Sequence, residues 1–283
     1  MTPRVLITGA TGFVGRQILA ACVARKVNMR LVVRAGWQDK LGDLPDTCEI
    51  VEVEDLFAQS ADWWAATLTG IDTLIHSAWY TEPGKYLTSP KNTECLIGTL
   101  QMARGAVQAG LRRFVGVGTC IEYQLGPKIL TPETALVPST PYGQAKAAAF
   151  HALSGLFGET KTEFLWCRLF QPYGEGEHAQ RLYPYLHNRL SAGKTVTLGS
   201  GREVRDFIDV KTAGANIFDA ARGKDVGAIN ICTGIPKSVR EFATEVAQIY
   251  GRPDLLKFGA LESSASDWDH IVGQPYQPDV PDS

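Results

Sequence analysis

The chain has 283 residues, of which 45% are hydrophobic and 20% are charged, so it can bury the core of one or two globular domains. Its formal net charge of −2 provides no broad basic surface for a phosphate backbone, which argues against nucleic acid as a partner. Six scattered cysteines, with no C-x-x-C pair and no histidine cluster at metal-ligand spacing, predict reduced thiols and no metal site.

Two further features of the sequence bear on location. No stretch approaches the length of a membrane span. The sequence also runs from MTPR directly into the strand-like VLIT, without a basic and apolar leader. We therefore expect a cytoplasmic protein with no membrane partner.

Short apolar runs alternate with longer helical patterns along the first part of the chain. The strand-like runs lie at residues 4–8, 29–33, 48–53, 72–76, 113–118 and 163–169. The helical patterns lie at 13–25, 60–69, 92–109, 141–158, 179–192, 211–222 and 238–250. This alternation predicts an α/β fold, in which a Rossmann-type, doubly wound parallel sheet carries helices on both faces.

The pattern changes after residue 169, where glycines and polar turns separate short elements. GAINICTG at 227–234 nevertheless has the composition of one more strand that returns to the sheet. We therefore predict two interleaved units, and we expect the tail 269–283 to be irregular. The units are a dinucleotide-binding domain over 1–168, to which 208–233 returns, and a smaller C-terminal substrate-binding lobe over 169–207 and 234–283.

The first strand leads into the glycine-rich loop TGATGFVG, immediately before a helix. Its first glycine permits a tight turn, the second lets a pyrophosphate approach the backbone, and the third brings helix and strand close together. A turn that binds nothing is the alternative, but strand, loop and helix in this order favour binding. The predicted phosphate contacts are Gly9, Thr11, Gly12, Phe13, Val14 and Gly15.

The end of the second strand bears on which dinucleotide is used. An Asp or Glu there usually holds a free ribose 2′-hydroxyl, whereas a 2′-phosphate needs a cation. This strand reads MRLVVRAG and ends at Arg34, with no carboxylate before Asp39. We therefore favour NADP(H) over NAD(H) as the cofactor, with a solvated surface arginine as the alternative.

Two short motifs carry reactive hydroxyls. PYGQAK at 141–146 places Tyr142 and Lys146 four residues apart, on one face of a helix, where an ammonium would lower the pKa of the phenol. GTCIEY at 118–123 places Thr119 at the carboxyl end of a strand, where its hydroxyl could orient a carbonyl or merely satisfy the backbone. Each motif alone leaves both interpretations open.

Together these motifs resemble the extended short-chain dehydrogenase/reductase family, in order and in spacing, over residues 4 to about 235. HSAW at 76–79 resembles the family's H-x-A-A, and VEVEDL carries its Asp-Leu pair. CRLFQPYGEGE resembles R-x-F-N-x-Y-G-P-G, and REVRDFIDV resembles the family's R-D-F segment. The chain is therefore similar to the NAD(P)-dependent group of this family that acts on nucleotide sugars.

The resemblance implies a role for each matching residue. Tyr142 would be the acid or base, Lys146 would lower its pKa and hold the nicotinamide ribose, and Thr119 would bind the substrate carbonyl. Further cofactor contacts would come from Asp55, Leu56, Ser77, Ala78 and Pro172. Substrate contacts would come from Tyr80, Thr81, Thr119, Cys120, Gln171, Arg181, Leu182 and Arg205.

Some positions depart from the family pattern or allow a second interpretation. Gln171 replaces the family's usual Asn, which leaves its sugar contacts open. Arg205 would neutralise the nucleotide diphosphate, with a surface salt bridge to Asp206 or Glu203 as the alternative. Family members commonly pair as homodimers through the helices that correspond to 92–109 and 141–158, so we expect the same assembly.

The residues after Thr119 narrow the reaction. Sugar-nucleotide dehydratases of this family carry Thr-Asp-Glu there, whereas this chain has Cys120 and Ile121, so elimination lacks its carboxylates. We expect NADPH-dependent reduction of the 4-keto group of a nucleoside-diphosphate-linked deoxysugar. A 4-epimerase with retained NAD(H) is the alternative. A non-catalytic dinucleotide sensor is a third possibility, against which the presence of both Tyr142 and Lys146 argues.

Overall fold

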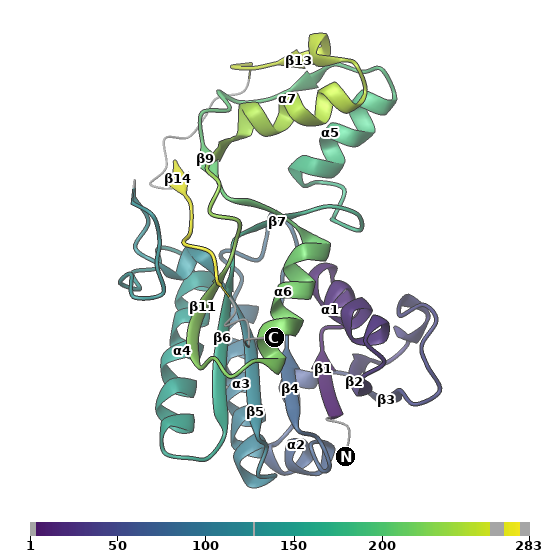
Figure 1. Cartoon of the computed structure of the whole chain (residues 1–283), viewed down its shortest axis with the longest axis vertical. Coiled ribbons are helices and arrows are strands. Elements are labelled where there is room, and N and C mark those ends of the chain that lie inside the picture. Colours follow the sequence, from purple (N-terminus) through teal and green to yellow (C-terminus); the bar gives the residue numbers. More distant parts are fainter. Residues whose placement is uncertain (1–3, 127, 261–268, 278–283) are drawn as a thin grey trace, which may run out of the picture.

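The computed structural model describes residues 4–126, 128–260 and 269–277. A seven-stranded parallel sheet forms its centre, in the order β11-β6-β5-β4-β1-β2-β3 (Figure 1). The strands are β1 (Arg4–Thr8), β2 (Asn28–Arg34), β3 (Glu49–Val53), β4 (Thr73–His76), β5 (Arg113–Thr119), β6 (Glu163–Leu169) and β11 (Gly227–Ile231). The predicted strands coincide with these to within a few residues.

Helices cover both faces of this sheet, which confirms the doubly wound α/β fold. On one face α1 packs against α6, and on the other α3 packs against both α2 and α4 (Figure 1). The bounds are α1 (Phe13–Ala24), α2 (Ala61–Thr67), α3 (Lys91–Gln108), α4 (Pro141–Gly158) and α6 (Val210–Arg222). The threonine and proline that open the fourth helix explain why its sequence prediction matches so closely: Thr140 caps the backbone and Pro141 occupies the first turn.

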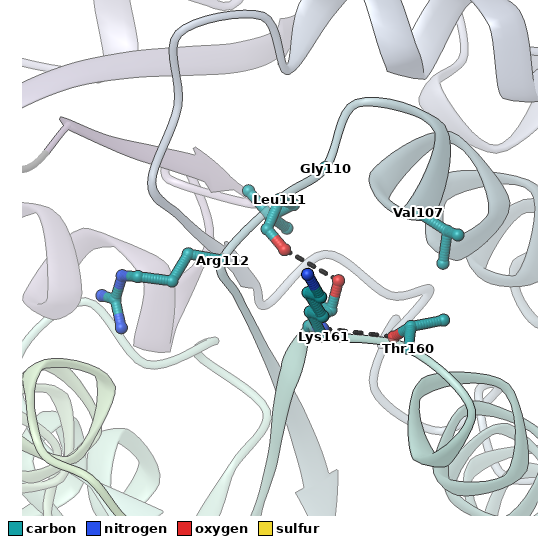
Figure 2. Close-up of a pocket in the computed structure, with 7 residues that line it drawn as sticks. Val107, Gly110, Leu111, Arg112, Thr160 and Lys161 are labelled. Atoms are coloured by element: carbon teal, nitrogen blue, oxygen red, sulfur yellow. Dashed lines mark hydrogen bonds between the residues drawn. The ribbon is translucent and has the colours of Figure 1, made fainter.

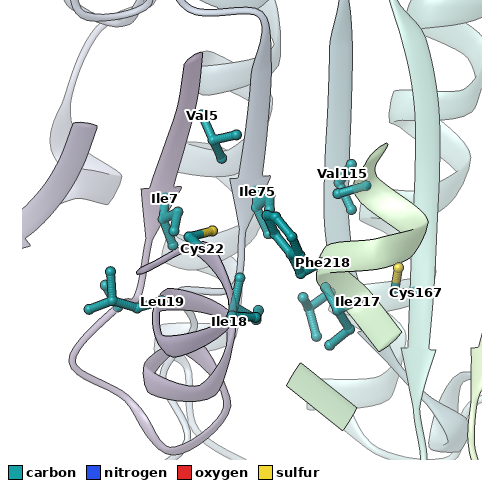
Figure 3. Packing of buried hydrophobic residues seen from close by; sticks show 14 of the residues in the cluster. Val5, Ile7, Ile18, Leu19, Cys22, Ile75, Val115, Cys167, Ile217 and Phe218 are labelled. Carbon is teal, nitrogen blue, oxygen red and sulfur yellow. The ribbon is translucent and has the colours of Figure 1, made fainter. Parts of the chain in front are cut away.

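The alternation of side chains along β1 shows why the strands are apolar on both faces near the centre of the sheet. Ile7 lies in the core cluster on one face with Ile18 of α1 and Phe218 of α6 (Figure 3). Leu6 lies in the cluster on the other face with Trp64 of α2. Because helices bury both faces, both sets of positions are mostly apolar.

A smaller group of elements follows β6. Two helices, α5 and α7, pack on each other and lie apart from the main sheet, at the top of Figure 1. They are α5 (Leu182–Ser191) and α7 (Val239–Ile249), with the short strands β7 (Gln171–Tyr173), β8 (Val196–Thr197), β9 (Val204–Arg205), β10 (Phe207–Asp209), β12 (Lys237–Ser238), β13 (Leu256–Lys257) and β14 (His270–Ile271). The expectation of an irregular tail is wrong at β14, which pairs with β9. The division into two domains stays a prediction, and 261–268 and 278–283 of the predicted lobe lie outside the described residues.

The strand order places a crevice at the carboxyl ends of the strands. The chain leaves β3 at one end of the sheet and returns to β4 on the other side of β1, so the connections after β1 and β4 diverge. In doubly wound sheets, ligands bind where such connections diverge, outside the carboxyl ends of the strands. Thr8 and Thr119 end β1 and β5 at this edge, next to the glycine loop and the HSAW segment.

Candidate active site

The glycine-rich loop packs tightly against the end of β4, with no room for larger residues at two of its glycines. Gly9 has a φ of 77°, and a Cβ atom on it would lie 2.6 Å from the amide nitrogen of Ala78. A Cβ atom on Gly15 would lie 2.0 Å from the carbonyl oxygen of Gly9. The hydroxyl of Ser77 donates a hydrogen bond to the Thr8 carbonyl at 2.8 Å. Larger residues at these two glycine positions would therefore displace the loop.

The start of α1 fits the pyrophosphate of a dinucleotide. Its cap residue, Gly12, has no side chain to bond the first-turn amides, so Phe13 and Val14 present N–H groups at the positive end of the helix dipole. Arg16 adds a cation one turn further, with its guanidinium bonded to the Thr11 carbonyl at 3.3 Å. Free amides and positive charge are what a helix terminus offers an anion.

The end of β2 carries two cations rather than one. The guanidinium of Arg34, which is exposed, lies 4.8 Å from the ring centre of Trp37. The ammonium of Lys40 lies 3.4 Å from the same ring. Lys40 was not predicted from the sequence, because only the turn Gln38–Lys40 brings it back beside Trp37. The two cations and the indole form one surface patch, with exposed Asp39 beside them.

The predicted adenine contacts lie at the end of β3. Asp55 caps the short helix η2 (Leu56–Ala58), and its carboxylate accepts a hydrogen bond from the Phe57 amide at 2.8 Å. Leu56 is half-buried and packs against the core cluster below it. Pro172, a further predicted cofactor contact, lies on β7 opposite Ile208.

Thr119, Tyr142 and Lys146 come together at the carboxyl end of β5. Tyr142 is buried in the first turn of α4, near enough to the Thr119 side chain for that hydroxyl to lower its pKa. The ammonium of Lys146, one turn later, donates to the Val117 carbonyl at 2.6 Å. The structure thus joins the two motifs that the sequence placed more than twenty residues apart.

The expected direction of the Tyr142 pKa is wrong for the protein by itself. Burial raises the pKa of Tyr142 above its usual range, and the nearby groups Tyr86 and Glu122 raise it further, against a lowering by Thr119. Burial also lowers the pKa of Lys146 to about 8. Spacing along a helix predicts that two groups are near each other, but it does not show how far both are removed from water.

Aromatic side chains that were not assigned from the sequence enclose these groups. The ring of Trp79 lies 3.8 Å from the Lys146 ammonium, a cation–π contact. The ring of Tyr86 lies 4.9 Å from that of Tyr142, edge to face. Asn92 holds the loop between them, since it accepts from the Trp79 indole at 2.9 Å and donates to the Tyr86 carbonyl at 2.6 Å. Their only sequence signal was the large residue in HSAW, where the family pattern has alanine.

The predicted substrate residues on the loop after β4 are less enclosed. The hydroxyl of Tyr80 donates to Glu82 at 2.8 Å, and Lys91 lies 4.9 Å from the Tyr80 ring. Thr81 is exposed. These contacts hold Tyr80 to its own loop, and they do not join it to Tyr142.

Two predicted substrate residues lie close to the reactive hydroxyls. Cys120 follows Thr119 directly, and burial raises its pKa to about 12. Arg205 on β9 is near enough to lower that pKa, and burial in turn lowers the pKa of Arg205. Among the described residues, no carboxylate pairs with Arg205 within 4.0 Å, because Asp206 instead accepts from Thr233 and from the Gly234 amide.

The remaining predicted substrate residues lie on β7 and at the start of α5. Gln171 is half-buried on β7, and its backbone N–H donates to the backbone carbonyl of Asp206 at 3.1 Å. Arg181 pairs with Glu177 at 3.5 Å, and Leu182 packs into the cluster between α5 and α7. No contact between these three side chains and Tyr142 is present in the described structure.

A hollow of about 360 Å³ lies at the opposite end of the sheet (Figure 2). It is bounded by the turns that follow α3 and α4, and Thr162 in its wall donates to the Leu111 carbonyl at 2.7 Å. Its lining residues are Val107, Gly110, Leu111, Arg112, Thr160, Lys161 and Thr162. Because it lies at the amino ends of β5 and β6, it shares no residue with the candidate site.

The described residues also bear on metals, disulfides and membranes. No group of three or more His, Cys, Asp or Glu side chains within them could hold a metal ion. All six cysteines lie in the described part of the chain, and each is a free thiol. None of the helices described is both long and apolar enough to span a bilayer.

Comparisons with known proteins show which family the chain resembles. The model of the NAD dependent epimerase/dehydratase family matches residues 5–232. The dTDP-6-deoxy-L-talose 4-dehydrogenase (NAD(+)) of Aggregatibacter actinomycetemcomitans is 24% identical over 85% of this chain and 88% of its own. The UDP-glucose 4-epimerase of Mycolicibacterium smegmatis is 25% identical over 90% of this chain and 85% of its own.

A solved structure shows the same fold. The UDP-N-acetylglucosamine 4-epimerase of Methanobrevibacter ruminantium M1, in complex with UDP-N-acetylmuramic acid, superposes with a TM-score of 0.86 at 18% identity, over 99% of this chain and 94% of its own. The family match identifies a nicotinamide dinucleotide as the cofactor and an enzyme of the oxidoreductase or isomerase group. The glycine loop, the paired hydroxyls and this match lead to one conclusion: the chain belongs to the NAD dependent epimerase/dehydratase family.

Proposed function

We propose that the protein uses NADPH to reduce the 4-keto group of a nucleoside-diphosphate-linked deoxysugar. The observation that carries this proposal is the meeting of Thr119 with the buried Tyr142 and Lys146 at the carboxyl end of β5. Relatives named as a deoxysugar 4-dehydrogenase and a 4-epimerase support chemistry at C4.

The raised pKa of Tyr142 suits the reductive direction. A phenol whose pKa lies above its usual range holds its proton until an acceptor of higher basicity arrives, and an alkoxide formed at C4 is such an acceptor. When bound, NADPH supplies the hydride. Thr119 orients the carbonyl by donating to its oxygen, Tyr142 then gives that oxygen its proton, and the Lys146 charge stabilises the phenolate left behind.

The patch at the end of β2 supports NADPH over NADH. Arg34 and Lys40 would meet a 2′-phosphate from two sides, and the Trp37 ring holds both cations in place. The NAD(+) in the name of the talose dehydrogenase points the other way, so the preference needs a direct measurement. Arg34→Ala and Lys40→Ala should each raise the KM for NADPH about tenfold and leave that for NADH unchanged. Arg202→Ala, an exposed change outside the patch, is the matched control.

We propose that Arg205 meets the substrate diphosphate. The arginine is half-buried, and within the described structure it forms no ion pair within 4.0 Å, since Glu203 and Asp269 act on it only from further away; a diphosphate would supply a directly paired charge. Arg205→Met should raise the KM for the nucleotide sugar at least about tenfold while kcat changes less. An unchanged KM would contradict this role.

The decisive assay follows NADPH absorbance with dTDP-linked and UDP-linked 4-keto-6-deoxy sugars. Reduction predicts one NADPH oxidised per sugar alcohol formed, and the absence of substrate-dependent oxidation with all of them would contradict the proposal. The 4-epimerase alternative is favoured by the UDP-glucose 4-epimerase relative. It predicts a dinucleotide that stays bound through purification and inversion at C4 without net NADPH loss.

We also propose a homodimer formed through α3 and α4. Ile97 of α3 is 56% exposed, and a partner helix packed on this face would bury it. Leu96, Leu100 and Val107 pack against the core and do not add to this outer face. Ile97→Glu should therefore produce a monomer in sedimentation analysis, whereas Ile249→Glu on the distant α7, where Ile249 is 73% exposed, should not.

A further inference from the structure

A buried carboxylate lies directly behind Thr119. Glu122 ends the short helix η3 (Cys120–Glu122) and has no exposed surface. One of its oxygens accepts from the Thr119 amide at 2.7 Å, and the other accepts from Arg168 Nε at 2.8 Å. The indole N–H of Trp166 lies 3.1 Å from both oxygens. Glu122 therefore fixes the end of β5 to two residues of β6.

The partners of Glu122 are fixed in turn. Arg168, which is 1% exposed, donates to the Tyr123 hydroxyl at 3.1 Å. That hydroxyl donates to Asn230 of β11 at 2.6 Å, and Asn230 donates to the Leu130 carbonyl at 2.9 Å. A buried network in which the members are hydrogen-bonded is rigid, so the position of Glu122 is set by three adjacent strands.

Two glycines of β5 make room for this arrangement. A Cβ atom on Gly118 would lie 2.2 Å from Trp166 Nε1 and 2.5 Å from a Glu122 oxygen. A Cβ atom on Gly116 would lie 2.2 Å from the ring of Trp166. The segments 116–119 of β5 and 166–168 of β6 thus pack together with Glu122 as one arrangement. The threonine with a glutamate three residues later is a capping-box pattern, which was visible in the sequence but was not used.

The Lys146 ammonium lies 5.6 Å from the centre of the Trp166 ring, and the indole N–H of that ring bonds Glu122, so the charge of Glu122 acts on both groups beside Thr119. It raises the pKa of Lys146, against the lowering by burial, and it raises that of Tyr142. The other ionisable groups that act on these two come from β4, from α3, from the loop before α3 and from η3. They are His76, Cys95, Tyr86 and Cys120.

We propose that Glu122 is a positioning residue that holds the Thr119 backbone so that its hydroxyl faces Tyr142, and that its charge keeps Lys146 an ammonium. The catalytic part of this inference rests on the proposed function. A purely structural role accounts poorly for the arrangement, because a buried ion pair is often no more stabilising than apolar residues of the same volume. Here the carboxylate also accepts the amide of the proposed carbonyl-binding residue.

The test uses Glu122→Gln, which removes the charge but keeps an oxygen for the Thr119 amide. Its matched control is Glu163→Gln, which removes the partner of buried Arg113 at the other end of the same two strands. The titration of Lys146 is followed by the ¹³Cε NMR signal, assigned with Lys146→Met. We expect the midpoint to fall by roughly one pH unit in Glu122→Gln and to stay in place in Glu163→Gln. We also expect kcat to fall roughly a hundredfold at nearly constant KM in Glu122→Gln alone.

Each of the two measurements tests one of the two roles proposed for Glu122. An unmoved Lys146 midpoint would overturn the electrostatic role, and an unchanged kcat in an active enzyme would overturn the positioning role. If Glu122→Gln does not fold, Glu122→Met/Arg168→Met removes both buried charges together, and the midpoint should still fall, but by less than in Glu122→Gln because the lost Arg168 cation offsets part of the effect. If the wild-type protein turns over no nucleotide sugar, the proposed function fails, while the titration still decides whether Glu122 controls Lys146.

Discussion

The two ends of strands β5 and β6 each hold a buried arginine paired with a glutamate, but in different surroundings. At the amino end, Arg113 pairs with Glu163 at 3.0 Å, and the Glu163 side chain is 40% exposed. Arg113 also donates to the carbonyls of Ala220 and Asp225 at 3.0 and 2.6 Å, so it ties β5 to the region around the end of α6.

At the carboxyl end, both partners are enclosed and the carboxylate bonds the amide of Thr119. The arginine–glutamate pair at the amino end therefore links structural elements, whereas the pair at the carboxyl end is part of the candidate site. What separates them is the neighbourhood: Tyr142 and Lys146 lie within electrostatic reach of Glu122, whereas Glu163 faces solvent. Mutations at the two ends should consequently separate activity from stability.

The largest expected effect is on activity at the carboxyl end. Tyr142→Phe removes the proposed proton donor and should lower kcat about 10²- to 10⁴-fold. The ring and its contact with Tyr86 are kept, so the free energy of unfolding should change by less than about 1 kcal/mol. Steady-state kinetics and urea unfolding measure both quantities. Tyr250→Phe, at the residue that follows the distant α7, is the control, and a Tyr142→Phe enzyme of normal rate would contradict the assignment.

The next effect is the pH dependence of stability at the end of β4. Burial lowers the pKa of His76 to about 3, while the unfolded value is near 6.5. Between pH 6.5 and about pH 3, His76 is protonated in the unfolded state but not in the folded state. The free energy of unfolding should therefore fall by about 1.4 kcal/mol for each pH unit over this range.

His76→Gln should remove this slope, because glutamine can still bond Thr8 and Thr99 on its two sides but does not titrate. His151→Gln, at an exposed position of α4, is the control. Urea unfolding between pH 4 and pH 7 gives the comparison. Equal slopes in wild type and His76→Gln would show that His76 is not responsible.

A glycine at each end gives the third contrast. Gly118→Ala at the carboxyl end forces Trp166 and Glu122 apart and should cost about 3 kcal/mol of stability. Gly110→Ala at the amino end meets open space, but its φ of 65° should cost about 1–2 kcal/mol. Only Gly118→Ala should also lower kcat, since it alone displaces Glu122, whose carboxylate bonds the Thr119 amide. Equal loss of kcat in the two variants would break the contrast.

The smallest expected effect is that of Glu163→Gln. Because Glu163 is partly exposed and Arg113 keeps its bonds to two carbonyls, the free energy of unfolding should fall by only about 1–2 kcal/mol. Its kcat and KM should equal those of the wild type. A loss of kcat in this variant would mean that the two ends are coupled through β5.

The sequence predicted the parts of this molecule that depend on local pattern. Apolar runs located all seven strands of the main sheet, and the Thr140–Pro141 start located α4. The motif spacing and the family resemblance brought Thr119 and Tyr142 together, which the geometry supports. Lys40, Tyr86 and Glu122 were missed because their roles arise from contacts in space: Glu122 meets Trp166 and Arg168 more than forty residues further along the chain.

The hydrogen bond between Tyr123 and Asn230 has a consequence for biosynthesis. During translation, β1 to β6 emerge and can pair before β11 exists, because β11 begins only at Gly227. Until then the Tyr123 hydroxyl, and through it Arg168 and Glu122, lack their last anchor. The nascent chain can therefore assemble most of its sheet early, but it completes the support behind Thr119 only when residue 230 has left the ribosome.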